Sequence, residues 1–215
     1  MTGAEWLAGA WLIAAYLLGA IPTGYLAGRW TRGIDLREHG SGNLGATNTF
    51  RVLGARIAAP VMVVDVAKGF IPAALFPEWD GAAGWGWALA YGAAAIVGHV
   101  FPVYMRFRGG KGVATAAGVF LAIAPKAVLP ALAAWLVVLK LSRMVSLASI
   151  TAAVTLIAGL AATEDRVAVL ILGVAVAGFV VYAHRSNIRR ILRGEEHRFG
   201  GKAGPTAPAQ QEEKS

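Results

Sequence analysis

The sequence predicts an all-α integral membrane protein built from seven transmembrane helices. Of its 215 residues, 57% are apolar and only 15% are charged, whereas a soluble domain carries about 25% charged residues. Apolar segments long enough to cross the roughly 30 Å hydrocarbon core of a bilayer recur along most of the chain. The chain has no cysteine, so it offers no disulfide framework, thiolate metal site or thiol nucleophile.

The apolar segments give seven predicted spans. They lie at Trp6–Ala27, Ile57–Phe76, Trp85–Met105, Val113–Ala124, Ala127–Leu141, Val145–Ala162 and Val167–Ala183. The fourth and fifth are short and are separated only by Pro125 and Lys126, so they can instead form a re-entrant pair whose ends return to the same side. The N-terminus lacks the basic region of a secretory signal, and we expect the first span to remain as an anchor.

The distribution of basic residues predicts how the spans are oriented. Lysines and arginines follow the first, third, fifth and seventh spans, whereas the alternate loops are mostly acidic or neutral. Because basic residues accumulate in cytoplasmic loops, the N-terminus is predicted outside and the C-terminus inside the cell. The same rule accounts for much of the net charge of +8, and the dispersed basic residues argue against nucleic-acid binding.

The expected domain organisation is simple. Residues 1–199 are predicted to form a single membrane domain, because nearly all of them are needed for the spans. Residues 200–215 are rich in Gly, Pro, Ala and Gln, which predicts a disordered cytoplasmic tail.

A glycine-rich polar segment follows the first span. Gly40, Gly42 and Gly45 permit positive φ and a close approach of the backbone to a ligand. Neutral hydrogen-bond donors alternate with them, namely Ser41, Asn43, Thr47 and Asn48. Arg51 comes one helical turn after Asn48 and can clamp an oxyanion through two N–H groups. The segment predicts a phosphate-binding loop, the alternative being an interfacial turn followed by an ordinary cytoplasmic arginine.

A second glycine cluster opens the fourth span. Gly109, Gly110 and Gly112 surround Lys111, so exposed backbone N–H groups and a helix dipole are expected beside a full positive charge. Thr115 follows within the first turn. The cluster is not a Walker loop, which would need Gly in place of Met105 and Ser or Thr in place of Gly112. The alternative is a lysine that extends to lipid headgroups.

A third polar cluster closes the seventh span. His184 and Asn187 are three residues apart, so on one helix they share a face and can address one ligand. The alternative for His184 is a structural hydrogen bond. The four histidines are scattered and no carboxylates stand at metal-ligand spacing, so no metal site is predicted. These histidines are His39, His99, His184 and His197.

Polar residues inside the spans leave two interpretations open. Asp65 and Lys68 can neutralise each other on one face of the second span, or they can support the site. Ser146 and Ser149 can join helices or face the cavity. His99, in the third span, is expected to pack between helices or to lie behind the site.

Four segments together resemble the motifs of bacterial PlsY-type acyl-phosphate:glycerol-3-phosphate acyltransferases, which are membrane-integral enzymes. They are Gly40–Arg51, Gly98–Pro102 with Phe107–Gly118, Val145–Ile150, and His184–Arg198. The resemblance extends from about Tyr16 to Phe199. It implies a seven-span enzyme of the bacterial cytoplasmic membrane, with its active site on the cytoplasmic side.

The resemblance also implies a reaction. A fatty acyl group would pass from acyl phosphate to the 1-hydroxyl of glycerol 3-phosphate, giving lysophosphatidic acid and inorganic phosphate in the first acylation step of phospholipid biosynthesis. No cofactor, acyl-CoA or acyl-carrier protein is expected, and an acyl-phosphate-forming enzyme would act upstream.

Motif positions imply the site residues. The catalytic set is Ser41, Arg51, Lys111, His184 and Asn187. The substrate-binding set is Gly42, Asn43, Gly45, Thr47, Asn48, Gly110, Gly112, Thr115, Ser146 and Ser149.

These residue types suit that chemistry. An acyl phosphate is a mixed anhydride with a stable leaving group, so positioning and charge neutralisation can supply most of the catalysis. Arg51 and Lys111 would gather two phosphates that otherwise repel each other. The hydroxyl proton can go to His184 as general base or to an acyl-phosphate oxygen. The second route is favoured, because no nearby carboxylate obviously orients His184.

Two other functional classes fit parts of the sequence. A transporter or channel for a phosphate-containing anion could use the same loops, but the clusters collect at one face and no internal repeat is evident. Another acyl or phosphatidyl transferase is the remaining alternative among enzymes. A metal-dependent phosphatidyltransferase would need an Asp-rich motif, which this sequence lacks.

Overall fold

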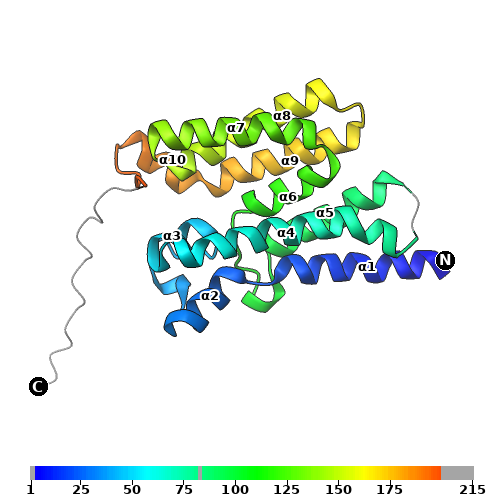
Figure 1. The fold of residues 1–215 in the computed structure, drawn as a ribbon, viewed down its shortest axis with the longest axis horizontal. Coiled ribbons are helices and arrows are strands. Elements are labelled where there is room, and N and C mark those ends of the chain that lie inside the picture. The colour runs from blue at the N-terminus through cyan, green and yellow to red at the C-terminus, as the bar shows by residue number, and fades with distance from the viewer. Residues whose placement is uncertain (1–2, 82–83, 200–215) are drawn as a thin grey trace, which may run out of the picture.

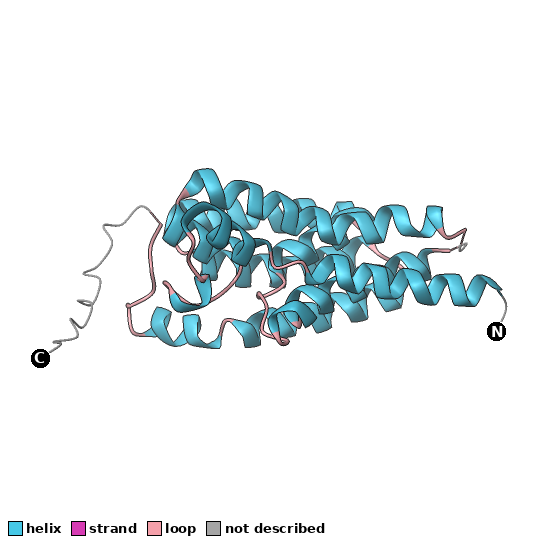
Figure 2. Cartoon of the chain, turned by 90° about the horizontal axis from the view of Figure 1, so that it is seen from below, coloured by secondary structure: helices cyan, strands magenta, loops and turns pink. Residues whose placement is uncertain are grey.

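The computed structural model describes residues 3–81 and 84–199. This part of the chain is helical and contains no strand (Figure 2), which confirms the all-α prediction. The helices form an elongated bundle in which α1, α4 and α5 lie on one side, α7, α8 and α9 lie on the other, and α6 lies between them (Figure 1).

Ten α-helices and two short 3₁₀ helices follow one another in the described residues. They are α1 (Gly3–Ala20), α2 (Thr23–Arg32), η1 (Leu36–Glu38), α3 (Ala46–Leu53), α4 (Ala55–Trp79), α5 (Trp85–Val100), η2 (Val103–Met105), α6 (Val113–Ile123), α7 (Pro125–Ser142), α8 (Val145–Thr163), α9 (Val167–Ala183) and α10 (Arg185–Leu192). Four segments are individually long and apolar enough to cross a membrane, or up to six if each of two bent helix pairs is one span. The seven-span count and the orientation stay predictions.

Prolines interrupt the helix in two of the predicted spans. The segment predicted as one helix to Ala27 is broken at Ile21 and Pro22, so α1 ends at Ala20 and α2 starts at Thr23 with a bend of 43°. The third predicted span, Trp85–Met105, is one of the four long apolar segments, but within it α5 ends at Val100, ahead of Pro102. Proline has no N–H to donate and its ring clashes with the preceding turn, which explains both breaks.

The short helix α6 occupies the centre of the bundle. Its 11 residues span about 16 Å at 1.5 Å per residue, roughly half of the hydrocarbon core of a bilayer. A Cβ on Gly118 would collide with the Val66 carbonyl, and one on Gly69 would collide with the Thr115 carbonyl, so α4 and α6 are in backbone contact. Only Ala124 separates α6 from α7. The full crossing of the fourth and fifth spans stays a prediction.

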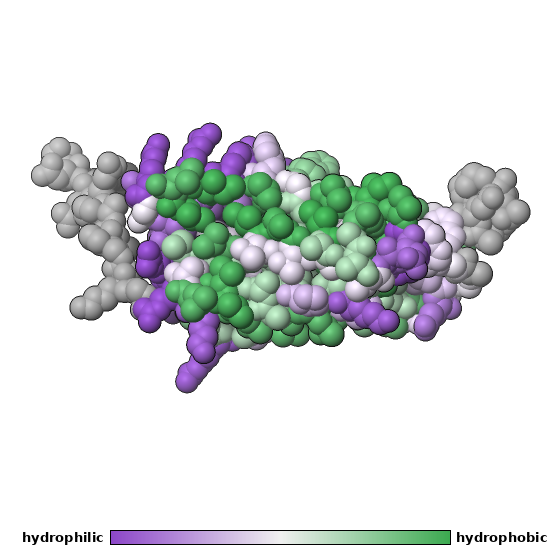
Figure 3. Space-filling view, turned by 90° about the horizontal axis from the view of Figure 1, so that it is seen from above, coloured by the Kyte–Doolittle hydropathy of each residue, from purple (hydrophilic) through white to green (hydrophobic). Residues whose placement is uncertain are grey.

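The outer surface of the bundle is apolar. On α7, Leu129 is 61% exposed and Leu136 is 54% exposed. Hydrophobic residues cover much of the middle of the face shown in Figure 3, and hydrophilic side chains lie toward both ends. Such a surface suits contact with lipid, since soluble proteins rarely expose large contiguous apolar patches. The fold is that of an integral membrane protein.

Candidate active site

The three polar clusters meet at one end of the bundle. Helices α2, α3 and α10 lie at the end opposite the N-terminus (Figure 1). The Lys111 ammonium donates a hydrogen bond to Asn187 Oδ1 at 2.5 Å, across 76 positions of sequence. The second and third clusters are thereby joined directly.

The first glycine loop depends on two glycines rather than three. Gly40 and Gly42 have φ of 64° and 70°, a region that side chains rarely adopt. Gly45 has a φ of −79°, so it does not use the freedom that the sequence suggested. It caps α3 instead, and its N–H donates to Asn43 Oδ1 at 2.9 Å.

Asn48 holds the shape of this loop. Its side chain is 1% exposed, accepts from the Ser41 N–H at 2.8 Å and donates to the carbonyls of Leu36 and His39 at 3.2 and 3.0 Å. The amide thus bonds within the protein, and its predicted contact with substrate stays a prediction. Ser41 lies exposed on the loop, and Thr47 lies exposed in the first turn of α3.

The second loop differs from its expected form. The N–H groups of Gly109 and Gly110 donate to the carbonyls of Val100 and His99, each at 3.1 Å. They are therefore not open to a ligand, and Lys111 is the part of the loop that reaches the other clusters. Gly112 caps α6 with a φ of 79°. Thr115 is fully buried, and its hydroxyl has no hydrogen-bond partner.

Glu196 lies at the centre of the joined clusters, although the sequence interpretation did not single it out. Its carboxylate accepts from Asn187 Nδ2 at 2.7 Å, from the Ser146 hydroxyl at 2.8 Å and from Arg190 Nε at 2.7 Å. Burial opposes its ionisation, but these hydrogen bonds outweigh burial and lower its pKa. The available signal was an acidic pair, Glu195 and Glu196, within a strongly basic segment.

Two cations of the site have no carboxylate partner among the described residues. Burial lowers the pKa of Lys111 to about 8, with Arg190 and Arg51 adding to this and Glu196 opposing it. Burial also lowers the pKa of Arg51. Cations that are partly desolvated and repel one another are stabilised when an anion binds near them. Arg51, Lys111 and Arg190 face a single carboxylate, so the site favours an anionic ligand.

His184 is the hinge between α9 and α10 rather than part of either helix. The two helices bend by 55° at this residue, so His184 and Asn187 do not share a face of one continuous helix as predicted. His184 Nδ1 lies 2.7 Å from the Val180 carbonyl, which can only accept, so Nδ1 carries the proton and Nε2 is left as an acceptor. Burial, and then Lys111, lowers the pKa of His184 to about 4, so the ring is neutral at pH 7.

The two serines of α8 separate in role. Ser146 belongs to the site through Glu196. Ser149 accepts from Trp135 Nε1 at 3.3 Å and links α8 to α7, and its predicted place in the substrate site stays a prediction. The chain after α10 returns to the first cluster, where Phe199 stacks on Phe50 with ring centroids 4.4 Å apart.

The fold and the site define a class: a helical membrane protein with a cluster of partly buried cations at its polar end. Among the described residues, no three His, Asp or Glu side chains are grouped closely enough to hold a metal ion. The site therefore offers hydrogen bonds and positive charge to a ligand, together with one neutral imidazole.

Comparison with known proteins identifies the family. Residues 9–194 match the family model described as glycerol-3-phosphate acyltransferase. The glycerol-3-phosphate acyltransferase of Synechococcus elongatus is 45% identical over 87% of this chain and 92% of its own length. That of Aquifex aeolicus is 43% identical over 87% of this chain and 97% of its own length. The chain belongs to the glycerol-3-phosphate acyltransferase family.

Solved structures agree with this assignment. The crystal structure of PlsY, an integral membrane glycerol 3-phosphate acyltransferase, in its glycerol 3-phosphate form has a TM-score of 0.83 and 42% identity, covering 90% of this chain and 96% of that one. The lysophosphatidic acid form has a TM-score of 0.80 and 41% identity, covering 90% and 95%. The fold is therefore that of a PlsY-type membrane acyltransferase.

Proposed function

We propose that this chain transfers a fatty acyl group from acyl phosphate to the 1-hydroxyl of sn-glycerol 3-phosphate. The products are lysophosphatidic acid and inorganic phosphate, and the reaction is the first acylation step of phospholipid biosynthesis. One observation carries the proposal. Arg51, Lys111 and Asn187 come together from three distant segments, and the two cations among them form no ion pair with a described carboxylate. The glycerol 3-phosphate and lysophosphatidic acid forms of the related PlsY support the acceptor and the product.

Arg51 and Lys111 bind the two phosphates. Acyl phosphate and glycerol 3-phosphate are both anions, and their mutual repulsion opposes the approach of the hydroxyl to the acyl carbon. Two cations that lack carboxylate partners offset this repulsion. The exposed Ser41 and the neighbouring loop, held in shape by Asn48, contribute neutral donors to the same anions.

The proton of the glycerol hydroxyl passes to the donor substrate. The new bond joins the 1-oxygen of glycerol 3-phosphate to the acyl carbon, the bond from that carbon to the phosphate oxygen breaks, and the released phosphate retains the proton. A pKa of about 4 for His184 makes its imidazole a weak base at neutral pH. The unprotonated Nε2 is nevertheless well suited to accept a hydrogen bond from the glycerol hydroxyl, and Asn187 helps to orient that substrate.

The proposed donor, acyl phosphate, requires no enzyme nucleophile. Phosphate is a good leaving group from a mixed anhydride, and the site has cations to stabilise it but no activated serine with a His–Asp pair. The acyl tail lies against apolar helix faces open to the lipid. The donor is water-labile and membrane-bound, so an acyl-phosphate-forming enzyme supplies it upstream.

The protein spans the cytoplasmic membrane of a bacterium with its N-terminus outside. The site faces the cytoplasm, where glycerol 3-phosphate is found. Support comes from the segments that carry basic residues, since α2, α3 and α10 lie at one end of the bundle and basic residues favour the cytoplasmic side.

Phosphate release by the purified protein in detergent tests this proposal. Palmitoyl phosphate is given with and without glycerol 3-phosphate, palmitoyl-CoA is tested as a competing donor, and lipid products are identified by mass spectrometry. We expect release that requires glycerol 3-phosphate and equals the lysophosphatidic acid formed. Turnover with palmitoyl-CoA alone would reject the donor, and no turnover with any donor by folded protein would favour a transporter of phosphate-containing anions.

A further inference from the structure

A buried ion pair lies inside the bundle, away from the site formed by Arg51, Lys111 and Glu196. Asp65 and Lys68, both on α4, are 1% and 3% exposed, and the Lys68 ammonium lies 2.8 Å from Asp65 Oδ1. Neither side chain contacts Arg51, Lys111 or Glu196. Burying two charges is costly even when they pair, and ionisable residues inside a membrane bundle usually serve function. The contacts of this pair indicate what that function is.

On one side, the pair holds the break between α1 and α2. The Lys68 ammonium donates to the Ile21 carbonyl at 2.9 Å, and the Thr23 hydroxyl donates to Asp65 Oδ1 at 2.6 Å. These bonds hold the residues on both sides of Pro22 and so fix the direction of α2 relative to α1. Gly24, in the first turn of α2, lies against the Leu44 carbonyl so closely that a Cβ would collide with it. The orientation of α2 therefore sets the place of the first glycine loop.

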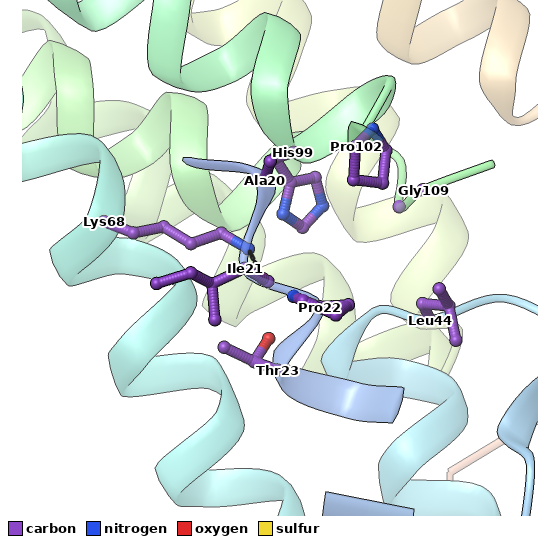
Figure 4. Close-up of a pocket in the computed structure, with 10 residues that line it drawn as sticks. Ala20, Ile21, Pro22, Thr23, Leu44, Lys68, His99, Pro102 and Gly109 are labelled. Atoms are coloured by element: carbon purple, nitrogen blue, oxygen red, sulfur yellow. Dashed lines mark hydrogen bonds between the residues drawn. The ribbon is translucent and has the colours of Figure 1, made fainter. Parts of the chain in front are cut away.

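On the other side, the pair faces the loop that carries Lys111. The ring of His99 has Nδ1 3.7 Å from Asp65 Oδ1. The same ring lies against Gly110, where a Cβ would collide with the imidazole. Figure 4 shows Lys68 reaching toward Ile21, with His99 and Gly109 on the far side of the small cavity between them. Asp65 and Lys68 thus contact residues that pack against both loops.

We propose that the Asp65–Lys68 pair is a positioning element that fixes the separation between the first glycine loop and the Lys111 loop. The inference rests on the proposed assignment of both loops to phosphate binding. A charged pair suits this task because its hydrogen bonds to Ile21 and Thr23 are directional, whereas apolar side chains of the same volume would fill the space without holding the backbone break. Misplacement of a binding group by about 1 Å can cost about 100-fold in rate.

The principal test replaces both members of the pair. The variant Asp65→Leu/Lys68→Met removes both charges, so no uncompensated charge is left in the interior. The matched control is Glu164→Gln/Arg166→Met, because Arg166 likewise pairs with a carboxylate and donates to a helix-end carbonyl, that of Ile123, at the opposite end of the bundle. For each variant, the thermal unfolding temperature, kcat and the KM for glycerol 3-phosphate are measured with palmitoyl phosphate as donor.

We expect the Asp65/Lys68 variant to remain folded with the KM for glycerol 3-phosphate raised about tenfold or more and kcat reduced. The control is expected to keep wild-type kcat and KM even if it unfolds at a lower temperature. Folded Asp65/Lys68 protein with wild-type kcat and KM would overturn the proposal. If the wild-type protein shows no turnover, the proposed function fails instead. The same assay therefore distinguishes that failure from a failure of the positioning proposal.

A milder variant keeps the proposal testable if the double substitution prevents folding. Thr23→Val has the same shape but lacks the hydroxyl that bonds Asp65. We expect a several-fold rise in the KM for glycerol 3-phosphate at an unchanged unfolding temperature. An unchanged KM in folded Thr23→Val protein would contradict the proposal.

The alkaline limb of the pH profile provides a readout that a merely structural role would not move. Lys111 is the titrating group, and the groups that face it are Arg51 from α3, His184, Arg190 and Asn187 from the α9–α10 segment, and Glu196. Loosening its loop admits water and raises the Lys111 pKa toward its ordinary value. We expect the limb to move to higher pH in Asp65→Leu/Lys68→Met, and an unmoved limb would contradict the proposal.

Discussion

Arg166 and Arg51 both lie close to helix ends, yet their surroundings differ. Arg166 donates to both oxygens of Glu164, at 2.6 and 2.5 Å, and to the Ile123 carbonyl at 2.8 Å. At the other end of the bundle, Arg51 and Lys111 form no ion pair with a carboxylate of the described residues, and burial lowers the pKa of each. Fully paired charges hold the structure together, whereas cations left without a counter-charge are available to a ligand.

Removing the unpaired cations should have the largest effect. Lys111→Met and Arg51→Met are each expected to lower kcat/KM by at least about 100-fold, because each deletes a charge that stabilises phosphate in the transition state. Arg51→Met should not lower the unfolding temperature, since it relieves repulsion within the site. Lys111→Met also loses the hydrogen bond to Asn187, so a small decrease is expected for it. Turnover from palmitoyl phosphate and thermal unfolding are measured together.

The matched controls for these variants are exposed basic residues. Lys140 and Arg56 lie exposed on α7 and α4, so Lys140→Met and Arg56→Met should retain wild-type turnover. Wild-type turnover in Lys111→Met or Arg51→Met would remove the basis for contrasting the two ends of the bundle.

Glu196→Gln should be the next most damaging change, because Glu196 is the only carboxylate of residues 3–81 and 84–199 that is bonded within the site. Three cations then face one another without compensation, and we expect a loss of about 1–3 kcal/mol in the free energy of unfolding. Adding glycerol 3-phosphate should restore part of this, since the bound anion supplies the missing charge. Unfolding temperature is measured with and without that ligand.

The neighbouring Glu195 is the control for this prediction. It is exposed, so Glu195→Gln should leave both stability and ligand stabilisation unchanged. Equal behaviour of the two glutamate variants would show that Glu196 is an ordinary surface carboxylate.

The pH dependence should report the state of Lys111. Activity requires the ammonium, so turnover at low glycerol 3-phosphate should fall about tenfold per pH unit above the Lys111 pKa of about 8. Saturating glycerol 3-phosphate should move this limb to higher pH, because a bound anion favours the charged form.

The same pKa has a consequence for stability with a definite sign. Because the folded pKa is depressed below the ordinary lysine value, the unfolded chain binds more protons between about pH 8 and pH 10.4, and the Lys111 contribution to stability rises with pH across that window. Thermal unfolding of wild type and Lys111→Met across this range isolates the contribution. A fall with pH for wild type relative to the variant would contradict the assignment.

The smallest expected effect separates the two serines of α8. Ser146→Ala removes a hydrogen bond to Glu196 and should lower kcat/KM by about tenfold, which corresponds to a net hydrogen bond of about 1.4 kcal/mol. Ser149→Ala removes only the bond from Trp135, so its kcat/KM should stay within about twofold. Equal losses in the two variants would place Ser149 in the substrate site.

Much of the fold could be predicted from local pattern. The apolar runs give the bounds of α4, α7, α8 and α9 to within three residues, because each run must bury its backbone polar groups in a helix when it lies in lipid. The breaks at Pro22 and Pro102 were missed, although both prolines were visible. Apolar length outweighed the missing N–H in the interpretation, whereas in the protein Lys68 and the Thr23 hydroxyl stabilise the first break.

The sequence named residues of the candidate site but not the contacts between them. Glycine-rich loops with a nearby Arg, Lys or His indicate anion binding from residue types alone. Residue types did not predict the orientation of each polar group. Gly109 and Gly110 turn their N–H groups inward, and Asn48 uses its amide within the loop. Glu196 gave only a weak signal, since its partners lie on three separate segments.

The sequence by itself determined the helical membrane fold and the three polar segments proposed to bind anions, because hydropathy, helix-breaking residues and side-chain charge are local properties. Only the tertiary structure decided that Lys111 reaches Asn187 across 76 positions, that Glu196 bonds three side chains of the site and that Asp65 and Lys68 contact residues packed against both loops. These are relations between distant residues. They depend on close backbone packing of helices, such as α4 against α6 at Gly69 and Gly118, which no local pattern specifies.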